Sequence, residues 1–137
     1  MKYIQFTCSL SDKSTPLPHF WEHTVGSGHA PLALRADWQA QLKKCKDELG
    51  FRHVRFHGLL SAMMDTLITV KGKHDYSFFN ANSIFDFLVS IDMRPFVELS
   101  FMPTTIASGH KEVFHYESNV TPPKIYNDWA ILIKKLV

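Results

Sequence analysis

The feature that most restricts the fold of this chain is an alternation of strand-like and helix-like segments. Residues 54–57 are rich in strand-forming side chains and stop at Gly58, and residues 96–102 form a mostly apolar run, as in a strand buried on both faces. Residues 34–49 precede the strand at residues 54–57, with apolar side chains every three or four positions and a terminating Gly50. This order predicts an α/β fold with parallel strands and right-handed helical crossovers.

Two further helices extend the pattern. One is predicted over residues 84–91, and another begins near Thr121, where two prolines follow a capping residue. The long loops at residues 61–80 and 104–120 follow strands, as do the loops that build the active sites of (β/α) barrels. The chain therefore offers about three βα units, whereas a closed barrel needs eight.

The beginning of the chain is predicted to be irregular. Residues 1–18 are an irregular segment with a short strand candidate at residues 3–6 and a turn-rich part at residues 11–18. Residues 19–23 are predicted to be a strand that ends in a tight turn at residues 26–28. We expect residues 1–137 to form a single domain.

Composition excludes several classes of protein. A hydrophobic content of 45% argues against disorder, and a net charge of +2 without any basic block argues against a nucleic-acid partner. No apolar run approaches the roughly 20 residues of a membrane span, and Gln5 interrupts the first apolar stretch. We therefore expect a cytoplasmic protein with no membrane partner, and its two cysteines are too few for a disulfide framework.

Several distinctive sequences carry a family resemblance. They are FWEHTVGSGHA (residues 20–30), LALR (32–35), VRFHG (54–58), PFVELSFMP (95–103), ASG (107–109) and NVTPPK (119–124). In this order they resemble the opening of the catalytic barrel of glycoside hydrolase family 39, which contains β-xylosidases and α-L-iduronidase. The resemblance is nearer to the β-xylosidases and covers roughly residues 18–137. It implies that residues 1–137 are a single partial domain, the N-terminal portion of a (β/α)8 TIM barrel.

The activity that the resemblance implies is retaining hydrolysis of β-xylosides or related glycosides by two glutamates, without a cofactor. The acid/base glutamate of the family lies in an Asn-Glu-Pro motif at the end of the fourth strand, and the nucleophile comes later. No Asn-Glu-Pro occurs in this sequence. We therefore assign no catalytic residue and expect an inactive fragment or truncated relative of such an enzyme.

The resemblance also implies part of a carbohydrate-binding wall. His57 matches a family position that contacts the sugar beside the scissile bond, and Phe114 matches an aromatic residue that lines the same pocket. Glu98 lies in an apolar run, where a carboxylate needs a partner, so it is either a sugar contact or a structural partner of Arg55. His115 departs from the family, whose members more often have tryptophan there.

Other interpretations are weaker or belong to another class. His19 and His23 have a spacing that could bind zinc on a helix, but this segment is predicted to be a strand, so no metal site is expected. Asn119 begins a formal glycosylation sequon. The chain could also be a noncatalytic carbohydrate-binding or interaction module that self-associates through exposed sheet edges.

Overall fold

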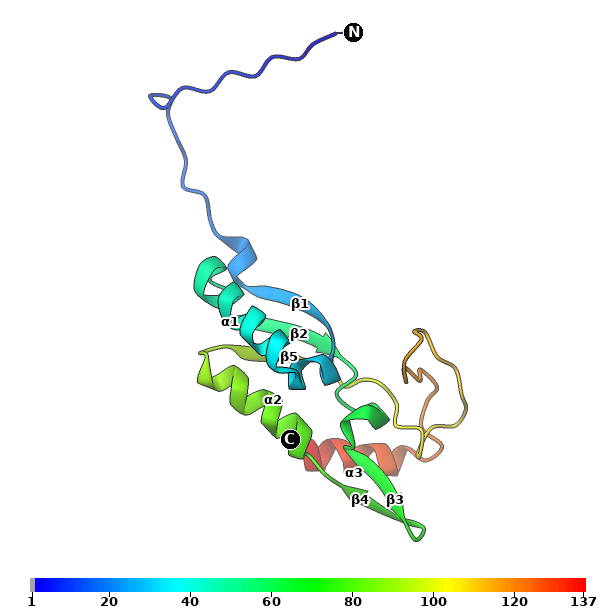
Figure 1. Ribbon diagram of the computed structural model, residues 1–137. Helices are drawn as coiled ribbons and strands as arrows, with labels where there is room; N and C mark the ends of the chain where they lie inside the picture. The colour runs from blue at the N-terminus through cyan, green and yellow to red at the C-terminus, as the bar shows by residue number, and fades with distance from the viewer. Residues whose placement is uncertain (1) are drawn as a thin grey trace.

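The centre of the molecule is a three-stranded parallel sheet in the order β1-β2-β5. The computed structural model describes residues 2–137, and Figure 1 shows the three strands side by side. Val25 of β1 pairs with Val54 of β2, which pairs with Pro95 of β5. The predicted α/β fold with parallel strands is therefore confirmed. The strands are β1 (Thr24–His29), β2 (His53–His57) and β5 (Arg94–Val97).

Two helices cover one face of this sheet. α1 (Ala36–Leu49) connects β1 to β2, and α2 (Phe79–Ser90) precedes β5, in agreement with the helical periodicity (Figure 1). Their buried side chains Leu42 and Leu88 belong to one cluster with Phe56 of β2. Burial of such apolar area removes it from water, which is the main force that holds the helices on the sheet.

The third helix lies beyond the sheet, beside a β-hairpin (Figure 1). α3 (Tyr126–Leu136) begins five residues after the expected Thr121, whose backbone N–H is bonded to the Asn119 side chain instead. The hairpin consists of β3 (Leu67–Val70) and β4 (Lys73–Tyr76). It lies where a loop was predicted, so that prediction was wrong. Leu132 of α3 is buried in a second cluster with Leu60, Leu67 and Ile106.

The opposite face of the sheet carries polar side chains. Val54 and Phe56 of β2 are buried, whereas Arg55 between them is exposed. The prediction of a strand buried on both faces at residues 96–102 was wrong, because the strand ends at Val97 and Phe96 is 48% exposed. Strand β5 pairs with β2 alone, so it is an edge strand with one helix-covered face.

The beginning of the chain differs from the prediction. Residues 2–18 are exposed and extend away from the body, and residues 3–6 form no strand because no other segment pairs with them (Figure 1). The aromatic segment is a short 3-10 helix, Phe20–Glu22, and the sequence Gly26-Ser27-Gly28 lies inside β1 rather than in a turn. Two further 3-10 helices are Ala30–Leu34 and Ala62–Met64.

Gly50 ends α1 as predicted. Its φ of 75° lies in the left-handed region, and its N–H bonds to the carbonyl of Lys46. A Cβ at this position would also meet the Glu22 side chain at 3.0 Å.

Replacing Gly50 by alanine should lower the free energy of unfolding by roughly 1–2 kcal/mol, because an L-residue resists this conformation. Chemical denaturation measures the loss. Gly26→Ala is the matched control, since a Cβ there meets nothing within 4 Å. Equal stability of the two variants would contradict this account of the helix end.

Candidate functional site

The candidate site lies at the carboxyl ends of the parallel strands. His29 is the last residue of β1, His57 is the last residue of β2, and the two are paired in the sheet. Because the strands run the same way, both side chains lie at the carboxyl end of the sheet, and their pairing puts them on one face. The long loop that follows β5 lies beyond this end (Figure 1).

This loop brings aromatic rings onto His57. The rings of His57 and Phe114 are stacked with their centroids 5.3 Å apart and an interplanar angle of 14°. Tyr116 lies next to both, 5.2 Å from Phe114, and its hydroxyl is hydrogen-bonded to Nε2 of His57. Phe101 packs against Phe114 edge to face at 6.0 Å. The structure thus places two of the residues expected in the sugar-binding wall, His57 and Phe114, in direct contact.

The loop has a fixed internal structure. The hydroxyl of Ser118, which is fully buried, accepts hydrogen bonds from the backbone N–H groups of Val113 and Phe114. Asn119 is 3% exposed, and its amide donates to the carbonyl of Gly109 while its Oδ1 accepts from Thr121. Buried polar groups with this many partners hold a loop in one conformation. Phe114 and Tyr116 are therefore presented by a rigid support.

Burial of the His29 ring lowers its pKa below the usual 6.5, because the charged imidazolium loses hydration. The nearby His57 and His115 lower the pKa of His29 further by charge repulsion. Tyr116 stacks on the His29 ring at 4.2 Å. The site therefore favours a neutral His29.

Glu98 is engaged by a cation. Its Oε1 lies 3.0 Å from Nη2 of Arg55, which is the partner that the sequence suggested. The angles of this ion pair do not make a hydrogen bond, so Oε1 is buried without one. The Glu98 side chain is 24% exposed, which leaves it within reach of solvent. This contact supports the interpretation of Glu98 as a structural partner of Arg55. A contact between Glu98 and a sugar stays a prediction.

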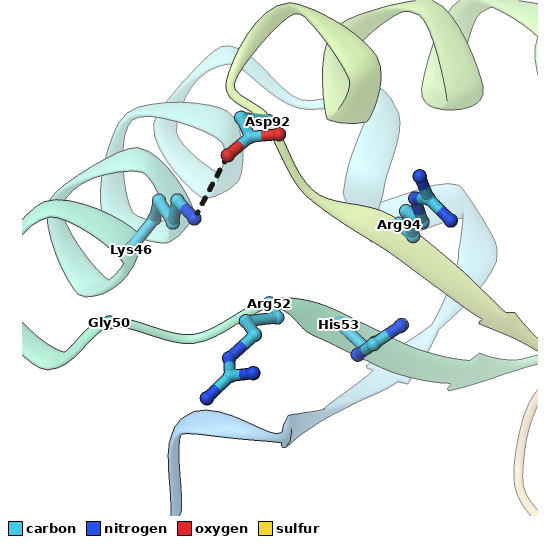
Figure 2. Close-up of a pocket in the computed structure, with 6 residues that line it drawn as sticks. All are labelled: Lys46, Gly50, Arg52, His53, Asp92 and Arg94. Atoms are coloured by element: carbon cyan, nitrogen blue, oxygen red, sulfur yellow. Dashed lines mark ion pairs between the residues drawn. The ribbon is translucent and has the colours of Figure 1, made fainter.

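A cavity lies at the opposite, amino-terminal end of the strands. Its volume is about 400 Å³, and Figure 2 shows Arg52, Arg94 and the Lys46–Asp92 ion pair around it. Both α1 and α2 end here. Basic side chains are favourable beside the negative ends of helix dipoles, so they have a structural explanation. The cavity is separate from the cluster at His57.

The structure also places the two histidines whose spacing could bind zinc, His19 and His23. Phe20–Glu22 is one 3-10 turn between His19 and His23, and His19 pairs with Glu22 at 2.6 Å. Within residues 2–137, no three histidine, cysteine or acidic side chains are close enough to hold a metal ion. In the same part of the chain, no helix is both long and apolar enough to cross a membrane.

Comparison with known proteins identifies the family. The model described as "Glycosyl hydrolases family 39" matches residues 6–137. The chain belongs to this family. A curated relative, the "Beta-xylosidase" of Caldicellulosiruptor saccharolyticus, is 50% identical over 136 residues, covering 98% of this chain and 28% of that protein. The "Beta-xylosidase" of Geobacillus stearothermophilus is 40% identical over 85% of this chain and 24% of its own length. The chain thus spans about a quarter of these curated relatives.

Solved structures of family 39 agree in fold. A "GH39 Beta-xylosidase from Caulobacter crescentus" has a TM-score of 0.81 at 31% identity, over 93% of this chain and 28% of that one. The "GH39 enzyme from Xanthomonas axonopodis pv. citri" has a TM-score of 0.80 at 32% identity, over 90% and 24%.

His29 and Tyr116 are site residues that the sequence reasoning did not assign. His29 was part of a family motif, but nothing in the sequence alone shows that a loop 87 residues later stacks on it. The strand register is the missing information, because it places His29 next to His57.

Ser118→Ala should loosen the loop that carries Phe114 and Tyr116. The substitution removes the acceptor of two N–H groups, so we expect the free energy of opening the loop to fall by about 1–2 kcal/mol. Exchange of the Val113 and Phe114 amide hydrogens, followed by NMR, should be about tenfold faster. Ser83→Ala, on the exposed side of α2, is the control. Unchanged protection at both amides would argue against this role of Ser118.

The low pKa of His29 makes stability depend on pH. Below pH 6.5 the His29 ring binds fewer protons in the folded state than in the unfolded state. The stability that His29 contributes to folding is therefore fully present above pH 6.5, and it is lost as the pH falls through 6.5 toward the folded pKa. Between pH 7.5 and 5, His29→Gln should lose less stability than the unsubstituted protein, whereas His74→Gln on the exposed hairpin should not differ from it. An NMR titration midpoint of His29 at or above 6.5 would show that the environment does not favour the neutral ring.

Proposed function

We propose that this chain provides part of the sugar-binding wall of a retaining glycoside hydrolase that acts on β-xylosides. In this proposal β1, β2 and β5 are the first three strands of a (β/α)8 barrel, and residues 1–137 form one partial domain. The parallel order of the strands, the helices on one face and the similarity to family 39 β-xylosidases support it. Sugar sites in such barrels lie at the carboxyl ends of the strands, where His57 lies.

The observation that carries the proposal is the contact between His57 and Phe114. A xylose ring has polar hydroxyls at its rim and C–H groups on its faces. An imidazole can bond the hydroxyls, and an aromatic face can cover the C–H groups. Phe114 is 47% exposed, so its ring is accessible for such a contact while the loop behind it is closed.

Hydrolysis in this class needs two carboxylates roughly 5–5.5 Å apart, one as acid/base and one as nucleophile. We assign neither to this chain, and Glu98, the carboxylate proposed as a sugar contact, is paired with Arg55. The chain alone is therefore proposed to bind a xyloside without cleaving it. The proposed sugar chemistry requires no cofactor.

A noncatalytic carbohydrate-binding module is the second candidate. The loop of residues 109–121 closes through its own hydrogen bonds, so the wall that it presents does not depend on other parts of a barrel. This candidate shares the binding surface and differs from the first in having no catalytic partner.

Binding can be tested by NMR with methyl β-D-xyloside. His57→Ala should weaken binding about fivefold, the equivalent of one hydrogen bond of about 1 kcal/mol. His53→Ala is the matched control, since this residue is at the other end of the same strand and should leave binding unchanged. Equal effects of the two substitutions would argue against a site at the carboxyl end.

An aryl β-xyloside assay completes this test. The purified chain should show no turnover above background, because a retaining mechanism needs both carboxylates. If the chain turns over substrate and Glu98→Gln abolishes the turnover, the catalytic part of the proposal is wrong.

A further inference from the structure

Tyr116 makes the most specific contact in the candidate site. Its hydroxyl is 2.5 Å from Nε2 of His57, and the planes of the two rings are within 3° of parallel. The residue lies 59 positions from His57 in the sequence, so only the folded loop creates this contact. Neither the family resemblance nor the proposed function uses it.

The chemistry of the two groups favours one direction of the bond. A neutral imidazole has one N–H and one unprotonated nitrogen, which is a good acceptor. Either atom of this pair can be the donor. A phenol O–H donates well to an unprotonated imidazole nitrogen, and in the arrangement where Tyr116 donates to Nε2 the ring proton of a neutral His57 is at Nδ1. Among residues 2–137, no group is hydrogen-bonded to Nδ1, which leaves Nδ1–H available to a ligand.

We propose that Tyr116 is a positioning residue that fixes the orientation and the tautomer of His57, so that Nδ1–H faces a sugar hydroxyl as donor. The part that concerns the sugar rests on the proposed function, whereas the tautomer does not. A histidine without such a partner interconverts between two tautomers, and only one of them has its N–H at Nδ1.

Three features enable Tyr116 to do this. Its ring is stacked with His29 at 4.2 Å and with Phe114 at 5.2 Å, and both are nearly parallel to it. The loop that carries it is closed by the buried Ser118. His29 beneath the ring is favoured in its neutral form by burial, so it adds little competing charge to the stack. These contacts restrict the rotation that would break the bond.

A competing interpretation assigns Tyr116 the opposite effect. Its hydroxyl could occupy the position on His57 that a sugar hydroxyl would take, so that a sugar must displace it. The two interpretations predict opposite changes in affinity when the hydroxyl is removed, which makes them separable by one substitution.

The test is Tyr116→Phe in the full chain, because phenylalanine keeps the ring stacks and removes only the hydroxyl. Nitrogen-15 NMR of the His57 ring should show one tautomer, protonated at Nδ1, in the unsubstituted protein and a mixture in the variant. Tyr126→Phe, a 72% exposed tyrosine on α3, is the control and should leave the His57 signals unchanged. Identical His57 spectra with and without the Tyr116 hydroxyl would overturn the proposal.

Affinity for methyl β-D-xyloside gives the second measurement. Tyr116→Phe should bind about threefold to tenfold more weakly, as expected for one lost ordering hydrogen bond. Tighter binding would overturn the positioning role and favour displacement. If the unsubstituted protein binds no xyloside but shows the single tautomer, the proposed function fails while the role of Tyr116 on His57 stands.

Discussion

The parallel register of β1, β2 and β5 is the constraint on which the rest of this structure depends. Parallel strands bring their carboxyl ends to one edge, and the pairing of His29 with His57 puts both rings on one face there. A shift of one residue in β2 would move the His57 ring to the helix-covered face. The buried side chains Val54 and Phe56 oppose such a shift, since it would expose them to water. The apolar core therefore fixes the position of the polar site.

The loop after β5 adds a surface of aromatic rings to this end of the sheet. A long loop without internal contacts would leave its aromatic rings in many positions. In this loop the buried side chains of Ser118 and Asn119 hydrogen-bond the backbone and hold Phe114 in place. The conformational entropy lost when the loop becomes ordered is offset by hydrogen bonds within the loop, and none of these contacts involves a ligand. A surface that is already ordered loses less entropy when it binds, which is the usual basis of preorganised recognition.

The sequence predicted those elements whose causes are local. Periodicity and a terminal glycine located α1, and the strand predicted at residues 54–57 from its composition and its glycine stop is observed at residues 53–57. The predictions failed where partners decide the outcome. Residues 3–6 have a strand-like pattern but no neighbour. Gly26-Ser27-Gly28 has a turn-like composition but lies within β1, where Gly26 pairs with Arg55. β3–β4 is a hairpin of mostly exposed residues. For the site, the family motifs led to His57 and Phe114, whereas Tyr116 and His29 required the register and the folded loop.

The buried state of Asn119 has a consequence for the sequon that it begins. In the folded loop Asn119 is 3% exposed, and its amide nitrogen donates to the carbonyl of Gly109, so the loop covers the group that a glycan would be attached to. Closure of this loop and modification of Asn119 therefore exclude one another. In any compartment that offers the modifying enzyme, the order of the two events during synthesis would decide whether Phe114 and Tyr116 ever reach His57.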